Sequence, residues 1–226
     1  MNADPTLNHF TALRFRDGWW ELDRKERQRF LEGAVTALQD ALPRVEFYRV
    51  FPTRHEADLL IWSAFAADDP AAVRNGLSAL GDALSPWRPQ ARPKATLWGL
   101  TRPSPYTRRA SSRTIDPLAG DRRPALVIYP FSKTTEWHLL EASARQELMG
   151  EHIRVGREFP EVDQLLLYSY GLQDQEFVVV YEMDDLARFS ELVGTLRATE
   201  VRRYTLRDTP VWTALHIAPD AVSSTW

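Results

Sequence analysis

The sequence predicts an α+β fold made of two tandem ferredoxin-like repeats. Three observations support it. Apolar periodicity gives the order strand, helix, strand, strand, helix, strand in the first half and the same order again in the second. WWELDRKERQRFLEG in the first half resembles WHLLEASARQELMGEH in the second, and LLIWSAFAADDPAAVRNGLSAL resembles FVVVYEMDDLARFSELVGTL. Between the halves lies a stretch with no periodicity. Each repeat forms an antiparallel sheet with its helices on one face.

The first half begins with a predicted strand at 9–15 and a helix at about 22–42, which Pro43 ends. Two strands follow at 45–50 and 59–65, and a second helix starts at Asp68-Asp69-Pro70. A strand at 95–100 closes the unit.

The second half is expected to contain strands at 126–130, 162–170, 176–182 and 211–216, with helices at about 142–157 and 186–199. Pro130 is expected to end pairing of the first strand, because proline has no N–H for a ladder. The predicted units are 1–103, a connecting loop 104–124, and 125–226, and the two sheets are expected to pack as a dimeric α+β barrel-type domain pair.

The connecting stretch from 101 to 124 holds four prolines and six arginines. A loop of this length in a compact protein is usually functional or disordered. The alternative is an exposed basic connector.

The composition excludes several classes of protein. With 28 Lys+Arg against 31 Asp+Glu, the formal charge is −3, which gives no electrostatic reason to expect nucleic acid. The absence of cysteine excludes disulfides, thiolate metal sites and cysteine nucleophiles. No apolar run has the length of a membrane span, and MNADPTLNHF has no signal-peptide pattern, so we expect a cytoplasmic protein without membrane insertion. Glycine-rich nucleotide loops, G-x-S-x-G and zinc-spaced histidines are missing as well.

His152 is the first candidate site residue. Its helix places it on one face with Leu148, Val155 and Phe159. A histidine on an apolar stripe is either a core residue with satisfied ring nitrogens or an axial ligand of haem iron. An axial histidine needs a partner for its other nitrogen, and Glu200 is a candidate.

Two further groups stand at predicted strand positions. Gln164 shares a strand face with Leu166 and Tyr168, so it either needs a buried partner or lies at the exposed start of the strand. Tyr129 and Lys133 lie where the strand at 126–130 ends. They are either ordinary rim residues or groups that bind and oxidise an acidic ligand.

Five elements in the second half, in the right order, resemble the chlorite dismutase family, and within it the branch of the coproheme decarboxylases. They are Tyr129-Pro-x-Ser-Lys133, Trp137-x-x-Leu140, Glu147-Leu-Met149-x-x-His152, Gln164 seven residues before Gly171, and Gly171-Leu-x-Asp174-x-Glu176. The resemblance extends from about 106 to 204, and the first half fits only through its topology.

The resemblance implies a role for each residue. His152 matches the proximal iron ligand and Gln164 the distal position, where true chlorite dismutases carry an arginine, so chlorite turnover is disfavoured. Tyr129 matches the tyrosine that becomes a radical, and Lys133 the lysine that holds a propionate. The expected porphyrin-binding residues are Arg109, Phe131, Arg197 and Glu200.

The implied function is peroxide-dependent oxidative decarboxylation of coproheme to haem b, with iron porphyrin and hydrogen peroxide as partners in a homo-oligomer, usually of five subunits. Gln175 and Phe177 stand where decarboxylases often carry tryptophan, which leaves the substrate open. The alternatives are a haem-binding protein with a weak peroxidase or sensing role, and a member of the same barrel superfamily without a cofactor.

Overall fold

The computed structural model describes residues 4–106 and 113–226. The elements of the first half are, in chain order, β1 (Thr6–Phe15), α1 (Asp17–Glu21), α2 (Arg24–Ala41), β2 (Arg44–Arg49), β3 (Leu59–Ala66), α3 (Pro70–Leu84), η1 (Ser85–Trp87) and β4 (Ala91–Thr101). Those of the second half are β5 (Ala125–Lys133), α4 (Thr135–Leu139), α5 (Ala142–Gly156), β6 (Asp163–Tyr168), β7 (Phe177–Met183), α6 (Leu186–Arg197), η2 (Glu200–Tyr204), β8 (Thr205–Arg207), β9 (Trp212–Ile217) and η3 (Pro219–Ser224). The chain therefore has an α+β fold.

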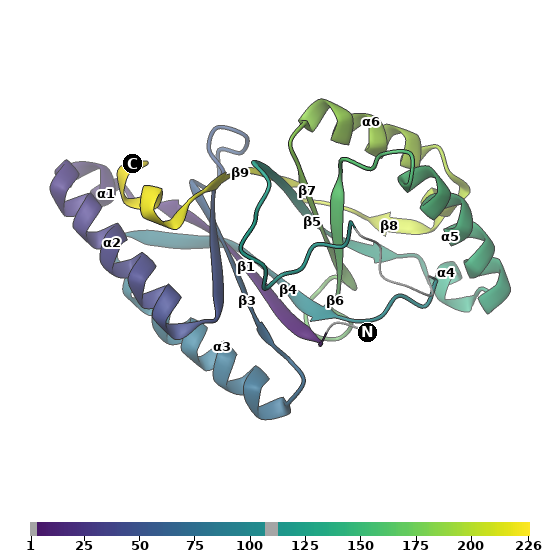
Figure 1. Cartoon of the computed structure of the whole chain (residues 1–226), viewed down its shortest axis with the longest axis horizontal. Coiled ribbons are helices and arrows are strands. Elements are labelled where there is room, and N and C mark those ends of the chain that lie inside the picture. Colours follow the sequence, from purple (N-terminus) through teal and green to yellow (C-terminus); the bar gives the residue numbers. More distant parts are fainter. Residues whose placement is uncertain (1–3, 107–112) are drawn as a thin grey trace.

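The strands of each half pair in the same order. In the first half β1 lies between β3 and β4, with β2 beyond β3; in the second, β5 lies between β7 and β9, with β6 beyond β7. The pairs β2–β9 and β4–β6 join the halves, so the antiparallel pairing of these eight strands closes on itself, and β8 is added to β5. Figure 1 shows the helices on the outside, with α2 and α3 over one half and α5 and α6 over the other.

Local sequence explains where the helices begin. Asp23 and Glu26 form a reciprocal capping box at the start of α2, with both bonds at 2.9 Å. Asp69 caps α3, whose first residue is Pro70, a favoured first helical position. Asp185 caps α6 by accepting hydrogen bonds from two backbone N–H groups.

Alternation along the strands divides the core into layers. One apolar cluster lies between the sheet and the helices of the first half, a second between inward-facing strand residues, and a third between β5, β7 and the helices of the second half. On β5, Leu126 and Ile128 belong to the inner cluster, whereas Val127 belongs to the third. The outer face of β5 is therefore the face that carries Tyr129.

The prediction that Pro130 ends strand pairing is wrong. β5 continues to Lys133, and Pro130 and Phe131 pair with β7 opposite Val178 and Phe177. The strand tolerates proline because β9 pairs with β5 only as far as Ile128, which leaves Pro130 with a ladder on one side.

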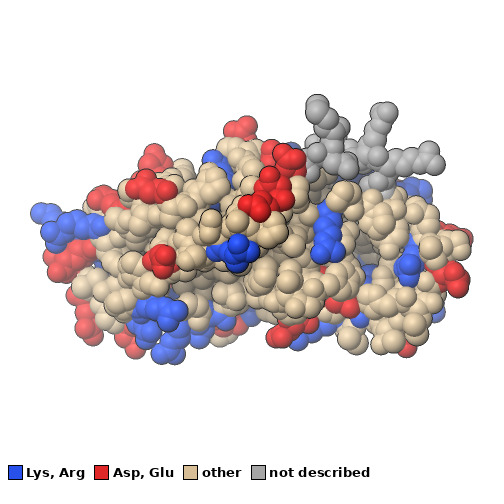
Figure 2. Space-filling model, turned by 90° about the horizontal axis from the view of Figure 1, so that it is seen from below, with Lys and Arg blue, Asp and Glu red and all other residues tan. Residues whose placement is uncertain are grey.

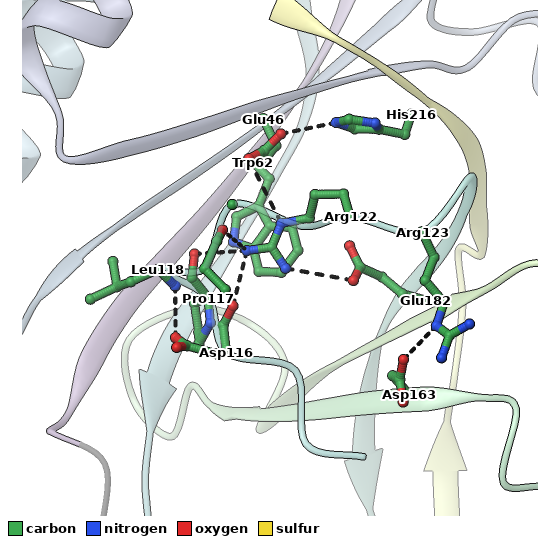
Figure 3. A network of polar contacts seen from close by, with 12 residues as sticks. Glu46, Trp62, Asp116, Pro117, Leu118, Arg122, Arg123, Asp163, Glu182 and His216 are labelled. Atoms are coloured by element: carbon green, nitrogen blue, oxygen red, sulfur yellow. Dashed lines mark hydrogen bonds and ion pairs between the residues drawn. The ribbon is translucent and has the colours of Figure 1, made fainter. Parts of the chain in front are cut away.

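The connecting segment is anchored through a buried arginine, which corrects the alternative of an exposed basic connector for this part of it. The Arg122 side chain is 1% exposed and lies 4.6 Å from the ring centroid of Trp62. Its guanidinium forms ion pairs with Glu182 at 3.5 Å and Glu46 at 3.8 Å (Figure 3). Its Nη2 donates to the carbonyl oxygens of Asp116, Pro117 and Ala119. A single side chain thus links β2, β7 and the connecting segment.

The surface carries both signs of charge. Figure 2 shows basic and acidic side chains interspersed on the face in view. Over residues 4–106 and 113–226, no helix combines the length and apolar character that crossing a membrane requires.

Candidate functional site

Three rows of paired residues form the outer sheet face of the second half. The strand register places them across β6, β7 and β5 as Gln164–Tyr181–Val127, Leu166–Val179–Tyr129 and Tyr168–Phe177–Phe131. Directly opposed residues on antiparallel strands present their side chains on the same face. Gln164 and Tyr129 therefore share a face with each other and with several aromatic rings.

This face is only partly covered by α5 and α6. Phe177 and Val179 are buried, but Leu166 is 36% exposed, and Tyr170, just beyond β6, is 41% exposed. Phe131 stacks on Phe177 with ring centroids 4.6 Å apart, and Lys133 Nζ lies 5.9 Å from the Phe131 centroid. Accessible apolar groups beside a polar rim are typical of a ligand cleft.

His152 lies on α5 with a ring nitrogen that has no protein partner. Its Nδ1 is buried and makes no hydrogen bond. Burial, followed by the nearby positive charge of Lys133, lowers the pKa of His152 to about 4. The imidazole is therefore neutral at pH 7, and this is the state in which histidine binds a metal. A core histidine with satisfied nitrogens does not describe this residue.

Lys133 ends β5 close to His152. Its Nζ lies 4.6 Å from the ring centroid of Trp137, and its backbone N–H donates to Glu176 Oε2 at 2.7 Å. Glu176 also contacts His138 Nε2 at 2.8 Å. Burial first, then the charge of Arg202, lowers the pKa of Lys133 to about 8, and Glu176 opposes the shift. Lys133 is thus a positioned cation that titrates near neutral pH.

Tyr129 lies on the same strand, one row inside Phe131. Burial raises the pKa of its phenol, while a hydrogen bond from Tyr181 acts in the opposite direction. Three charged side chains influence it as well: Asp208, Arg197 and Arg202.

Arg197 and Arg202 share one carboxylate. Asp208 Oδ2 accepts from Arg202 Nη1 at 2.7 Å and from Arg197 Nη2 at 3.2 Å. The two guanidinium groups and Lys133 together carry more positive charge than Asp208 neutralises. Arg202 was not among the residues predicted from the sequence; its signal there is the pair of arginines at 202 and 203, in the same short helix as Glu200.

The expected contact between Glu200 and His152 is absent. Glu200 forms an exposed ion pair with Arg203 at 2.9 Å, and its backbone N–H donates to Glu151 Oε2 at 3.2 Å. The cause is local: Glu200 begins η2, and its side chain turns to the residue three positions later in the same helix.

Gln164 is exposed near the start of β6, as one of the two sequence interpretations expected. The connecting segment pairs with it: Gln164 N–H donates to the Arg113 carbonyl at 2.9 Å, and Ile115 N–H donates to the Gln164 carbonyl at 3.1 Å. The Arg113 side chain donates to the carbonyls of Gly156 and Phe159, at the end of the helix that carries His152.

Arg113 therefore connects the segments that hold His152 and Gln164. No sequence pattern predicted a role for Arg113, because it lies in the aperiodic segment.

Arg109, expected to bind the ligand, lies outside the described residues. A cavity of about 390 Å³ at Asp116, Arg122 and Glu182 contains none of the predicted site residues.

Comparison with known sequences places the chain in a known family. The profile of the chlorite dismutase family matches residues 31–217, and the chain belongs to this family. A protein of Mycolicibacterium smegmatis named coproheme decarboxylase is 30% identical over 179 residues, which cover 76% of this chain and 72% of that protein. A coproheme decarboxylase of Staphylococcus saprophyticus is 32% identical over 80 residues, covering 33% of this chain and 32% of its own.

Solved structures show the same fold. A variant of the chlorite dismutase of Candidatus Nitrospira defluvii superposes with a TM-score of 0.84 at 20% identity, over 97% of this chain and 94% of the other. The same enzyme in complex with imidazole gives a TM-score of 0.81 at 21% identity, with the same coverage.

Proposed function

We propose that the chain binds an iron porphyrin between the outer sheet face of the second half and α5, and that it decarboxylates the propionates of coproheme to give haem b. The observation that carries this proposal is His152: its imidazole is neutral, has a ring nitrogen without a protein partner, and lies near Lys133 at the end of the partly accessible sheet face. The names of the curated relatives support the choice of reaction.

The outer sheet face suits such a ligand in its apolar character and in the charge of the side chains beside it. A flat apolar macrocycle requires an apolar wall, and Leu166, Phe131 and Tyr168 supply one. Four carboxylates require cations, and Lys133, Arg197 and Arg202 lie at the end of β5 and in the segments packed beside it. Arg109 is proposed as a further cation on the family resemblance.

When bound, the iron group would supply the oxidising equivalents taken from peroxide. His152 would hold the iron through its neutral nitrogen, and Lys133 would hold a propionate close to Tyr129. Gln164, on the same face, would offer a neutral amide to peroxide. It would not supply the charge of an arginine.

Tyr129, once it has lost one electron to those oxidising equivalents together with its phenolic proton, would remove a hydrogen atom from the β-carbon of that propionate and so regain its O–H. Per vinyl group, the propionate side chain loses carbon dioxide, one proton and two electrons, and the two electrons reduce one peroxide to water. Two rounds convert coproheme to haem b, so the protein must present two propionates to Tyr129 in turn.

The test is Tyr129→Phe, which removes the hydroxyl and keeps the ring. We expect iron coproporphyrin to bind with an unchanged absorption spectrum, and mass spectrometry after peroxide addition to show no loss of carboxyl groups. Tyr204→Phe, which alters a phenol packed on Trp137, is the matched control and should retain stepwise decarboxylation. Haem b formation by Tyr129→Phe would refute the role of Tyr129; binding without decarboxylation by the unaltered chain would favour a haem-binding protein.

The proposal also covers the domain architecture, the oligomeric state and the cellular location of the protein. The matching strand orders support two ferredoxin-like repeats, with units at 1–103 and 125–226 whose strands close into a barrel. A homo-oligomer in the cytoplasm remains part of the proposal, and sedimentation of the purified chain would establish the number of subunits.

A further inference from the structure

Glu176 lies one residue before β7 and extends the contact between β7 and β5 through its side chain. The backbone ladder of these two strands ends at the pair Phe131–Phe177. Two residues farther along β5, the Lys133 N–H donates to Glu176 Oε2 at 2.7 Å. The carboxylate therefore takes the acceptor position that a backbone carbonyl has inside a ladder, and it fixes the backbone from which the Lys133 side chain extends.

The second carboxylate oxygen of Glu176 holds α4. His138 Nε2 lies 2.8 Å from Glu176 Oε1, and because an ionised carboxylate only accepts hydrogen bonds, the His138 nitrogen is the donor. The preceding residue of α4 is Trp137, and Lys133 Nζ lies 4.6 Å from its ring centroid. One carboxylate thus binds both the strand end that carries Lys133 and the helix that carries the ring under its ammonium.

Glu176 is itself held by the first half of the chain. Its backbone carbonyl accepts from the Ser169 N–H at 2.7 Å, and Ser169 Oγ donates to the Trp98 carbonyl of β4 at 2.6 Å. Gln173 contacts the same strand twice: its Oε1 accepts from the Trp98 N–H at 2.9 Å, and its Nε2 donates to the Thr96 carbonyl at 3.1 Å. The segment between β6 and β7 is therefore attached to β4, which gives Glu176 a fixed position.

We propose that Glu176 is a positioning residue for Lys133: it holds the end of β5 and α4 together and so keeps the Lys133 ammonium over Trp137, where a ligand carboxylate would bind it. That a carboxylate binds there rests on the proposed function. The two hydrogen bonds of Glu176 belong to the unliganded chain, so they can be tested without ligand.

Positioning and charge predict opposite effects of losing Glu176. A negative side chain near Lys133 repels ligand carboxylates, so removal of its charge alone favours their binding. Positioning favours binding, because a lysine that is already held in place loses less conformational entropy when the ligand binds. Loss of Glu176 therefore weakens carboxylate binding only if positioning outweighs charge.

Two variants separate these contributions. Glu176→Gln removes the charge but keeps an oxygen for the Lys133 N–H and an amide that can donate to the other tautomer of His138. Glu176→Ala removes the charge and both hydrogen bonds. Asp174→Ala is the matched control, since it removes a carboxylate from an exposed position of the same segment.

The first experiment follows the three lysines of the unliganded chain by NMR, with lysine labelled with ¹³C at Cε. Lys133→Met identifies the Lys133 signal by its loss, and Lys25 and Lys94 are exposed references. In Glu176→Ala we expect the Lys133 signal to move toward those two references, because the side chain leaves the Trp137 ring. It should stay in place in Glu176→Gln and Asp174→Ala. A Lys133 signal that is the same in Glu176→Ala and in the unaltered chain would overturn the inference.

The second experiment measures amide hydrogen exchange at the end of β5. We expect exchange of the Lys133 amide to accelerate about three- to tenfold in Glu176→Ala, the factor that corresponds to one lost hydrogen bond. The Thr134 amide, which donates to the Tyr204 carbonyl at 3.0 Å, should exchange as before. Equal acceleration at both amides would show that the strand end opens as a whole, and would contradict a specific role for Lys133.

The third experiment measures the Kd of iron-free coproporphyrin at pH 7. We expect Glu176→Ala to raise it about two- to tenfold, as for the immobilisation of one flexible side chain, and Glu176→Gln and Asp174→Ala to leave it unchanged or lower. In a Lys133→Met background, Glu176→Ala should not raise the Kd further, because Glu176 acts through Lys133. A rise of the same size in that background would refute the positioning role. If the unaltered chain did not bind coproporphyrin, the proposed function would fail, and the lysine and amide signals would still decide whether Glu176 positions Lys133.

Discussion

The two halves have the same strand order but use the space between sheet and helices differently. In the first half Phe15, at the end of β1, stacks on Trp19 of α1 with centroids 4.4 Å apart. In the second half Lys133, at the end of β5, lies over Trp137 of α4 at 4.6 Å. At the same place in the fold, an apolar contact has been replaced by a cation beside an aromatic ring.

The same contrast holds for His152, the proposed iron-binding residue, and for Tyr129. Counted from the helix N-caps Asp23 and Glu141, Ala34 on α2 corresponds to His152 on α5. Ala34 is buried in the core, whereas His152 keeps an unpartnered nitrogen. Counted back from the N-caps of α1 and α4, Thr11 corresponds to Tyr129.

This comparison indicates that the two halves have different roles. The C-terminal segment adds further cover to the first half, where Trp226 packs edge-on to Phe15 at 5.3 Å and η3 lies against α2. The second half leaves Leu166 and Tyr170 accessible and contains charged side chains near its core. The first half thus fills the space beside its sheet, whereas the second half leaves part of the corresponding sheet face accessible.

The largest expected effect is that of His152→Ala, which gives the second half the alanine that the first half has at the corresponding position, Ala34. We expect the affinity for iron coproporphyrin to fall by more than about 100-fold, since loss of a mere hydrogen-bond partner of a metal ligand already costs about 10- to 100-fold. Absorbance titration measures it. Iron-free coproporphyrin, which is held by its carboxylates alone, should bind the variant and the unaltered chain equally. Equal affinity for the iron compound would show that His152 is not its ligand.

The reverse exchange, Ala34→His, tests the stability side of the comparison. We expect it to lower the free energy of unfolding by about 2–4 kcal/mol, because it overfills a packed core and buries a polar ring without partners. His152→Ala in the unliganded chain should change that free energy by less than about 1 kcal/mol. Urea unfolding of both variants measures the two changes in the free energy of unfolding. Similar decreases in the two variants would contradict the contrast between the halves.

The smallest expected effect concerns pH and Lys133. Its pKa of about 8 means that the ammonium is charged below pH 8 and neutral above it, while ligand carboxylates are ionised throughout. The Kd of iron-free coproporphyrin should therefore rise by up to about tenfold between pH 7 and pH 9. Lys133→Met should abolish that rise, and Lys94→Met, at an exposed lysine of the first half, should retain it. A pH-independent Kd in the unaltered chain would argue against contact between Lys133 and a carboxylate.

Sequence patterns predicted the regular elements well because local forces determine them. Asp69-Pro70 marks the start of α3, and the apolar period of α2 matches its buried face. The extension of β5 through Pro130 could not be foreseen, since it depends on which neighbour strand stops short. The short helices α1 and α4 and the three-residue strand β8 are too brief to show a period.

The candidate site likewise contains some residues that sequence motifs predict and others that they do not. Tyr129, Lys133 and His152 follow from motifs, and the structure brings Lys133 close to His152. Arg113 contacts backbone carbonyls of residues 156 and 159, and Arg202 influences Lys133 across the fold, and a single sequence reveals neither relation. The partner expected for His152, Glu200, was wrong because an ion pair within η2 competes for its carboxylate.

The buried Arg122 has a consequence for how the molecule denatures. Glu46 comes from the first half and Glu182 from the second, and Arg122 forms ion pairs with both from the segment between them. Glu46 also pairs with Arg44 of its own strand, whereas Arg122 is the ion-pair partner found for Glu182 among the described residues. If the first half opened and withdrew Arg122, Glu182 would lose its counter-ion in a low-dielectric interior, which is strongly unfavourable. Together with the β2–β9 and β4–β6 ladders, this makes partial opening rare and couples the halves into a single melting transition.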